Sequence, residues 1–405
     1  MTAAALPTRS SRLSGVGGVL LCIAFTAALL ANHSVARVVL VLVPLAAVAL
    51  LSMQPAAVVL SRRLPVPIVL FVLWCIASTA WTRSSVGTQD ALLDLVAAVA
   101  TGWCLGSLAT YDELLRWCSR GVRAIVAVTI AVLRVAPGWS TQPAIDGAPG
   151  WHSVFTHKNG LGAFTVIALV TLWHDRRAPH RHLWMAGCLV LMVGSRSSTS
   201  LALLLVLIAV LMWKRSLGNL STAPARAGYL TASVGLVVGA VLVFISRFDV
   251  LTSVLGRGSD LSGRTGIWNS VWRAGVDRPV LGYGFGGTWV EPVAPTSTIW
   301  KELRFEAFHA HSGYLDLLLQ VGFVGLLLFL TAVVVTALRA LRHGGPGGSW
   351  AATVLLLLSL NALAESGPFL GIGLLVVSLL ASTATNHRCT DGRPAVPVRL
   401  PVRTA

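Results

Sequence analysis

The sequence predicts an all-α fold: a polytopic transmembrane bundle of about twelve helices. Of the 405 residues, 55% are hydrophobic and only 11% are charged, whereas soluble domains carry about 25% charged residues. The mean hydropathy is +0.77. Basic residues also cluster in every second gap between the apolar runs, which is the charge pattern that orients membrane helices.

Each predicted helix is an apolar run close to the roughly 20 residues that cross a bilayer. Several runs are shorter, and a bundle tolerates short spans because neighbouring helices cover their ends. The runs lie at 15–31, 35–54, 65–81, 90–109, 121–136, 159–174, 182–195, 199–213, 228–246, 313–337, 350–364 and 368–384.

The chain divides into four expected segments. The first apolar run follows Arg9 and Arg12, and no small-x-small cleavage pattern follows it, so we expect an uncleaved span rather than a signal peptide. The segments are transmembrane helices one to nine in 1–246, an extracytoplasmic loop with an amphipathic helix in 247–312, helices ten to twelve in 313–384, and a cytoplasmic tail in 385–405.

The basic residues also predict orientation and exclude some functions. Most of the 31 lysines and arginines fall on the side that becomes cytoplasmic when both termini are cytoplasmic. The net charge of +16 would suggest nucleic-acid binding in a soluble protein, but here it serves topology, so no nucleic-acid partner is expected. The six cysteines show no CxxC or zinc spacing, and none falls in a predicted outer loop, so no disulfide framework is expected.

Polar clusters precede four of the helices that begin at the outer face. Helix N-termini attract anions because their first N–H groups are unpaired. Small polar residues there suit N-cap positions, but capping does not explain Lys158, Arg196 or His311. Cations oppose the helix dipole by roughly 0.3–1 kcal/mol when exposed, so a bound anion is expected. The clusters are His157-Lys158-Asn159, Ser195-Arg196-Ser197-Ser198-Thr199, His309-Ala310-His311-Ser312 and Glu365-Ser366-Gly367-Pro368, with Asn159, Thr199, Ser312 and Ser366 as expected N-caps.

The outer loop contains two further patterns. Residues 264–274 predict an amphipathic helix, with Ile267 and Val271 on its apolar face and Arg264 in its first turn. Such a helix could lie on the membrane surface over the bundle, with Arg264 pointing into a site below it. The run 282–287 matches GxGxxG but lacks a strand–helix context, so we expect a turn or a close approach of the backbone to the bundle.

In this order the motifs resemble those of the O-antigen ligase and O-antigen or exopolysaccharide polymerase superfamily of bacterial envelope glycan transferases. The resemblance covers about residues 150–330, and the first five helices match only in hydropathy. This chain lacks the acidic residue often found before the glycine at 322, so no acid–base role is expected at 320 or 321. The matching pieces are Phe155–Gly162, Gly194–Ser197, Gly263–Trp268, Pro279–Gly286 and His311–Asp316.

The resemblance implies a GT-C-like fold and a reaction. Family members transfer a glycan from an undecaprenyl-pyrophosphate-type carrier to an acceptor sugar, on the outer face of the bacterial inner membrane, without a metal or another cofactor. The resemblance assigns a role in that chemistry to Arg196, Arg264 and His311. Ligase and polymerase remain alternatives, although His157-Lys158-Asn159 looks most like the exopolysaccharide polymerase branch.

The residue types suit that chemistry. Arg196 and Arg264 could stabilise a leaving pyrophosphate through bidentate hydrogen bonds, with Lys158 as a supporting point charge. His311 is the expected general base because an imidazole with a pKa near neutrality suits proton abstraction, and His309 could exchange roles with it.

The remaining substrate-binding candidates are His157, Asn159, Arg83 and Glu365. Glu365 is an alternative base or an orienting partner, unless it is a solvated loop carboxylate. Arg83 could bind donor phosphates or could instead anchor the protein to lipid headgroups. The expected partners are the polyprenyl-pyrophosphate-linked donor, a glycan, lipid or protein acceptor, and membrane lipids. A transporter or flippase of lipid-linked glycans is the competing class, but neither a convincing internal repeat nor midplane charges favour it.

Overall fold

The computed structural model describes residues 64–142, 149–246, 264–370 and 372–390, together with residues 45, 46 and 49. The predicted spans at 15–31 and 35–54 lie outside the described residues, apart from those three. Residues 247–263 of the predicted loop and 391–405 of the predicted tail also lie outside them.

The described part of the chain is helical, as the sequence predicts, with one small antiparallel sheet that pairs Thr141 with Trp151 and Gln142 with Gly150. The elements are α4 (Val66–Ala77), the 3-10 helix η1 (Ser78–Ala80), α5 (Ser85–Ser107), α6 (Tyr111–Val135), β1 (Thr141–Gln142), β2 (Gly150–Trp151), α7 (Lys158–His174), α8 (Arg181–Ser195), α9 (Ser198–Asn219), α10 (Ala223–Ser246), α12 (Arg264–Asp277), α13 (Thr296–Leu303), α14 (Gly313–His343), α15 (Gly345–Asn361) and α16 (Ile372–Thr390).

Several helices suit a bilayer. Within the described ranges, α5, α9 and α14 are long and apolar enough to cross a membrane, and Val66–Ala80 and Ile372–Thr383 are shorter apolar helical stretches. Many large apolar side chains on α4, α8 and α9 are exposed, as expected for surfaces that face lipid. The chain is therefore a helical membrane protein, and the full set of about twelve spans stays a prediction.

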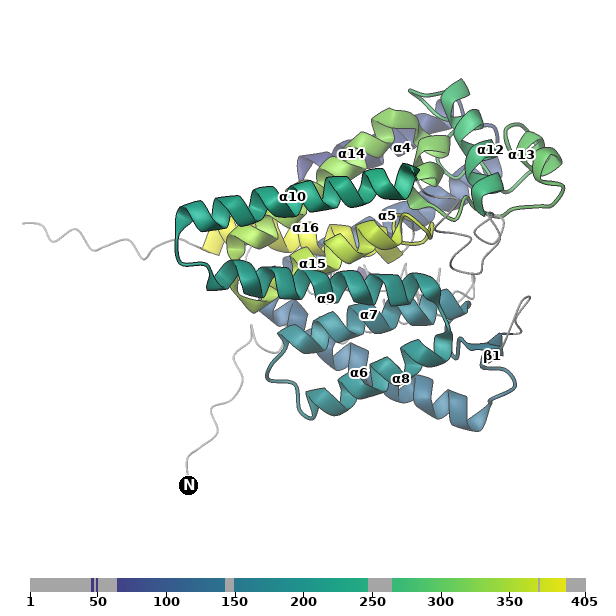
Figure 1. Ribbon diagram of the computed structural model, residues 1–405. Helices are drawn as coiled ribbons and strands as arrows, with labels where there is room; N and C mark the ends of the chain where they lie inside the picture. Colours follow the sequence, from purple (N-terminus) through teal and green to yellow (C-terminus); the bar gives the residue numbers. More distant parts are fainter. Residues whose placement is uncertain are drawn as a thin grey trace, which may run out of the picture.

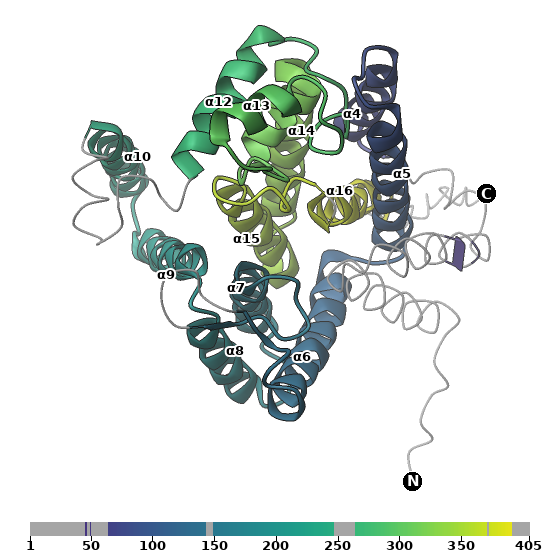
Figure 2. The same ribbon diagram turned by 90° about the vertical axis from the view of Figure 1, so that its right-hand side faces the viewer.

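The helices run back and forth along the bundle (Figure 1). The connection from α8 to α9 lies at the same end as β1, α12 and α13, while the connections from α7 to α8 and from α9 to α10 lie at the opposite end. Figure 2 views the molecule from the end that carries α12 and α13, and shows α4, α5 and α16 on one side and α6, α7 and α8 on another.

The main apolar core joins α4, α5, α14, α15 and α16, with side chains from α6, α7 and α9. Helices α5 and α16 pack closely because small residues line their contact. A Cβ added at Gly102 would stand 2.7 Å from the Leu375 carbonyl oxygen, and one at Gly106 would stand 2.2 Å from that of Leu379. Larger side chains at these glycines would force the two helices apart.

Helix α14 is interrupted at Gly322, whose φ of 66° and ψ of −173° are not helical. The interruption frees carbonyl groups that an unbroken helix would use. The Leu319 carbonyl accepts from the Tyr283 N–H at 2.9 Å, and the Gln320 carbonyl accepts from the Gly284 N–H at 2.8 Å. A break at membrane depth is tolerated where other groups satisfy the freed backbone in this way.

The glycine-rich run of the loop therefore binds α14, which confirms the predicted close backbone approach. A Cβ on Gly282 would stand 2.6 Å from the Gln320 carbonyl oxygen, a distance that only glycine allows. The Phe323 N–H donates to the Pro279 carbonyl at 2.7 Å, and the Gly286 N–H donates to Gln320 Oε1 at 2.8 Å. Gln320 thus serves the packing of the loop.

Candidate functional site

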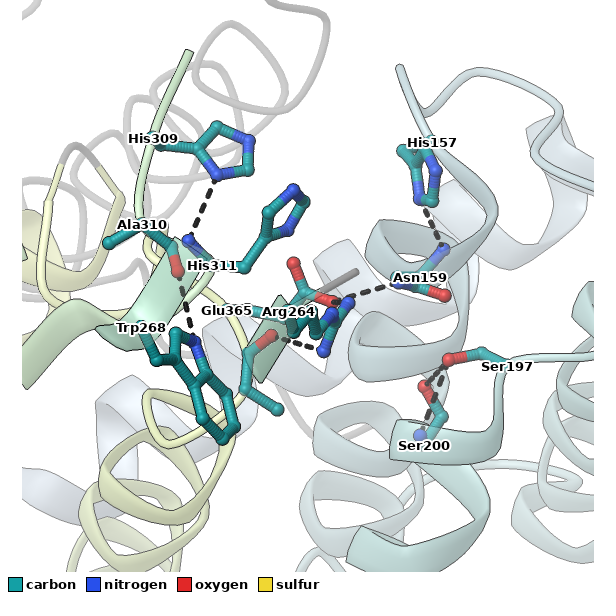
Figure 3. Close-up of polar contacts among 11 residues, drawn as sticks. His157, Asn159, Ser197, Ser200, Arg264, Trp268, His309, Ala310, His311 and Glu365 are labelled. Carbon is teal, nitrogen blue, oxygen red and sulfur yellow. Dashed lines mark hydrogen bonds and ion pairs between the residues drawn. The ribbon is translucent and has the colours of Figure 1, made fainter. Parts of the chain in front are cut away.

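A charged cluster joins three distant segments at the end of the bundle that carries α12 (Figure 3). Arg264 Nη2 lies 3.0 Å from Glu365 Oε1, and Arg264 Nη1 donates to the Ala364 carbonyl at 2.7 Å. Asn159 Nδ2 donates to the same Glu365 oxygen at 2.8 Å. The Arg264 and Glu365 side chains are only 18% and 21% exposed. This ion pair is therefore less screened by water than a surface pair.

Glu365 is thus no solvated loop carboxylate, because its side chain is largely buried and binds Arg264 and Asn159. One carboxylate oxygen accepts from both α7 and α12, while Glu365 itself belongs to the connection between α15 and α16. It therefore fixes the position of Arg264. An arginine offers five N–H donors, and these two contacts leave others for a ligand.

Helix α12 begins at Arg264, and its apolar face packs against other helices of the protein, which fixes the orientation of α12. Ile267 and Val271, on the predicted apolar face, are buried against Ile299 of α13 and Leu319 of α14. The protein itself therefore covers this apolar face, and the location of α12 at the membrane surface over the bundle stays a prediction.

His311 lies beside this cluster, in a turn with an uncommon backbone. Its φ is +52°, a left-handed conformation that few residues other than glycine adopt. Its N–H donates to His309 Nδ1 at 3.3 Å, and the two rings meet edge to face with centroids 4.0 Å apart. The buried Nδ1 of His311 has no hydrogen-bond partner among the described residues. An uncommon conformation and an unsatisfied buried polar atom are both features that concentrate at functional sites.

The electrostatic environment changes the expected chemistry of His311. Burial lowers its pKa to about 3, and the neighbouring His309, Arg264 and His157 lower it in the same direction. The expectation of a pKa near neutrality is therefore wrong for the site as it stands. Desolvation and nearby cations both disfavour the imidazolium, so His311 is neutral at physiological pH.

The start of α7 differs from the sequence prediction. The N-cap is His157, whose Nδ1 accepts from the Asn159 N–H at 3.1 Å, so Asn159 lies inside the helix and its amide is free to bind Glu365. The Lys158 N–H donates to Gln142 Oε1 at 3.2 Å. These contacts satisfy the first backbone donors of α7, so an anion here would meet side chains instead. Burial lowers the pKa of His157, and nearby Glu365 opposes this shift.

Of the other three predicted N-caps, Ser312 lies at the predicted position and two differ. Ser197, not Thr199, caps α9, with its Oγ accepting from the Ser200 N–H at 3.3 Å. Ser312 occupies the N-cap position of α14, but no side-chain cap bond forms. Ser366 precedes α16 by several residues and does not cap it.

Arg196 and Arg83 are exposed and lie outside the Arg264–Glu365 cluster. Arg196 ends α8 in a left-handed conformation with φ +51°. It directly precedes Ser197, which lies near the start of α7 (Figure 3). Arg83 lies near Tyr283, where its positive charge opposes the increase in the tyrosine pKa that burial causes. The structure thus places Arg196 at the same end of the bundle as the cluster. It places Arg83 near Tyr283.

Apolar helices with a half-buried, charged cluster at one end define a class: a helical membrane protein with a polar site at one face of its bundle. Residues 182–330 match the O-antigen ligase family. The chain is also 26% identical, over 235 residues, to the exopolysaccharide production protein ExoQ of Rhizobium meliloti (strain 1021). This similarity covers 55% of the chain and 54% of that protein, so the chain spans about half the length of this curated relative.

These similarities confirm the resemblance to the O-antigen ligase and polymerase superfamily that the motifs indicated. The family match contains Arg196, Arg264 and His311, the residues to which the resemblance assigned roles. His157, Lys158 and Asn159 precede the matched residues. Their place in the site rests on the contact between Asn159 and Glu365.

Proposed function

We propose that this protein is a membrane glycosyltransferase that moves a glycan from a polyprenyl-pyrophosphate carrier to an acceptor hydroxyl. The observation that carries the proposal is the convergence of Arg264, Glu365, Asn159 and His311 from four separate segments at one end of the bundle. The positive-inside pattern supports an outer-face site in the inner membrane with both termini cytoplasmic. The proposed fold class is GT-C-like, with the four segments expected from the sequence.

In the proposed reaction, the acceptor oxygen attacks the anomeric carbon of the donor glycan. The bond from that carbon to the pyrophosphate oxygen breaks, and the polyprenyl pyrophosphate leaves with the electron pair. His311 takes the proton from the acceptor hydroxyl. Arg264 donates hydrogen bonds to the developing negative charge, which is the kind of preorganised stabilisation that contributes most to such reactions.

Charge balance explains why further cations would be needed. Glu365 offsets the charge of Arg264, so the pair alone attracts a pyrophosphate weakly. Lys158 and Arg196 would supply the net positive charge, and the exposure of Arg196 lets it reach a ligand. We propose no metal or other cofactor for this step. Arg83, beside Tyr283, would contact carrier phosphates or lipid headgroups away from the reacting atoms.

The low pKa of His311 fits this scheme once the donor is bound. An imidazole with a pKa of about 3 is ready to accept a proton but holds it weakly. A bound pyrophosphate would add negative charge beside the buried imidazole and favour the imidazolium, so the donor itself would strengthen the base.

The pH dependence of kcat/KM tests this environment. Because the pKa of His311 is lowered to about 3, the base stays neutral on acidification, and kcat/KM should remain flat between pH 7 and pH 5. A base with an ordinary histidine pKa of about 6.5 would lose roughly 25-fold over that range. The acid limb of kcat should lie at higher pH than that of kcat/KM, because kcat reports the donor complex. A kcat/KM limb near pH 6.5 would contradict the predicted environment.

Glu365→Gln should lower kcat/KM by about tenfold, because a hydrogen bond to a charged group contributes about 1.5–3 kcal/mol. The amide removes the negative partner of Arg264 and keeps the side-chain shape. The matched control is Glu302→Gln, which removes the negative partner of Arg273. Arg273 lies on α12, like Arg264, but its ion pair with Glu302 is exposed. Steady-state kinetics should show little change in the control. Equal kinetics for Glu365→Gln and wild type would show that the ion pair has no role in transfer.

A reconstituted transfer assay tests the function itself. Purified protein in vesicles would receive a pyrophosphate-linked oligosaccharide donor with EDTA, alongside the His311→Ala variant. Glycan growth on the donor carrier, lost in the variant, would identify a polymerase. Transfer to a different lipid, protein or glycan acceptor would identify a ligase.

The same assay distinguishes the enzyme from the competing class, a transporter of lipid-linked glycans. A transporter would move labelled donor across the bilayer and form no new glycosidic bond. That outcome would reject the enzyme proposal. Persistence of transfer in His311→Ala would instead retain the enzyme and reject His311 as its base.

A further inference from the structure

Ala310, between His309 and His311, forms hydrogen bonds through both its backbone N–H and its backbone carbonyl. Its N–H donates to the carboxylate of Asp316, with both oxygens at 3.2 Å. Its carbonyl accepts from Trp268 Nε1 at 3.0 Å. Ala310 is fully buried, so these bonds are made away from solvent and are costly to lose.

The two partners come from the elements that form the site. Trp268 follows Arg264 by one helical turn of α12, so both side chains project from the same face of that helix. Arg264 reaches the connection between α15 and α16, while Trp268 reaches the turn that carries His311 (Figure 3). One rigid helix thus sets the position of the arginine and that of the histidine turn.

Asp316 fixes the other side of the turn from within α14. Its side chain is 0% exposed, and its Oδ1 also accepts from Trp289 Nε1 at 2.9 Å. A buried carboxylate is retained only where several donors satisfy it, and here two of these donors belong to the outer loop. The first turn of α14 therefore fixes the loop directly before His311.

We propose that Trp268 and Asp316 are positioning residues that hold the 309–311 turn, with His311 in its left-handed conformation, and thereby set the place of His311 relative to Arg264. The inference rests on the proposed function, because positioning matters for a base that must meet an acceptor hydroxyl. A misplacement of about 1 Å can cost roughly 100-fold in rate.

The main test is Trp268→Phe, which removes the indole N–H and keeps an aromatic ring. We expect kcat to fall about 10- to 100-fold, with less than about a twofold change in KM for the donor. The matched control is Trp300→Phe, in the same loop. It also removes an indole hydrogen bond to a backbone carbonyl, from Trp300 Nε1 to Ala307 at 2.8 Å. The control should keep kcat within about twofold of wild type.

A second pair of variants addresses Asp316. Asp316→Asn keeps a carbonyl oxygen for the Ala310 N–H and should retain more activity than Asp316→Leu, which has no acceptor. Only variants that keep the elution profile and the thermal unfolding midpoint of wild type would be compared. Equal activity for the asparagine and leucine variants would overturn the role of Asp316.

A readout without catalysis separates this inference from the proposed function. Carbethoxylation of each histidine by diethyl pyrocarbonate at pH 7, followed by mass spectrometry, reports how accessible each neutral ring is to the reagent. His311 should react several-fold faster in Trp268→Phe than in wild type or Trp300→Phe, because its turn is released. Faster labelling without any transfer in wild type would support positioning and reject the glycosyltransferase. Unchanged labelling and kcat in Trp268→Phe, or equal losses in both tryptophan variants, would overturn the inference.

Discussion

His311→Asn is expected to reduce glycan transfer by about 10²- to 10⁴-fold, the usual contribution of a general base. Asparagine tolerates the left-handed backbone that His311 adopts, with φ +52°, so the turn should keep its shape. It offers no nitrogen that can accept the hydroxyl proton. The loss would therefore report chemistry rather than folding. Transfer rates with a fluorescent lipid-linked donor would measure it.

The control for this variant is His182→Asn, an exposed histidine at the first turn of α8. It should transfer at the wild-type rate. His311→Ala should match His311→Asn in activity but unfold at a lower temperature, because alanine is strained at this φ. Retention of more than about a tenth of wild-type turnover in His311→Asn would show that another group takes the proton.

Arg264→Lys should lower kcat/KM by about 10²- to 10³-fold although the positive charge remains. The two terminal nitrogens of Arg264 bind the Ala364 carbonyl and Glu365 at 2.7 and 3.0 Å, and a single ammonium group cannot reproduce this fork. The displaced charge would then miss the leaving pyrophosphate. Single-turnover kinetics with saturating enzyme would separate this chemical defect from weaker donor binding.

Arg273→Lys provides the comparison on the same helix. Arg273 makes an exposed ion pair with Glu302 at 2.8 Å, and such pairs contribute little, so activity should stay within about twofold of wild type. Wild-type kinetics in Arg264→Lys would mean that Arg264 anchors the loop and takes no part in the reaction.

Much of the helical architecture follows from the sequence alone. Apolar runs between basic loops correctly predicted α4 to α10 and α14 to α16, because a bilayer constrains the length and composition of spanning helices. The short helix α13 was not predicted. The contacts of the apolar face of α12 with α13 and α14 could not be predicted in the same way. An apolar stripe looks the same whether lipid or protein covers it, and only tertiary packing decides between them.

The site was predictable in its residue types but not in its pairings. Arg264, Asn159 and Glu365 were each candidates, yet nothing in the local pattern shows that one carboxylate oxygen binds the other two. The depressed pKa of His311 could not be foreseen, because it depends on burial and on neighbours far apart in the chain. The positioning role proposed for Trp268 was missed because a tryptophan in an amphipathic helix is more commonly part of the packing.

The break in α14 at Gly322 limits how far the glycine-rich run of the loop can move. Three backbone hydrogen bonds connect the loop to the broken helix: Tyr283 with Leu319, Gly284 with Gln320, and Phe323 with Pro279. Withdrawing the loop would leave all these groups without partners, at several kcal/mol for each buried group. We therefore expect residues 279–287 to stay bound to α14. In the proposed transfer, donor and product would therefore exchange without any displacement of this segment from α14.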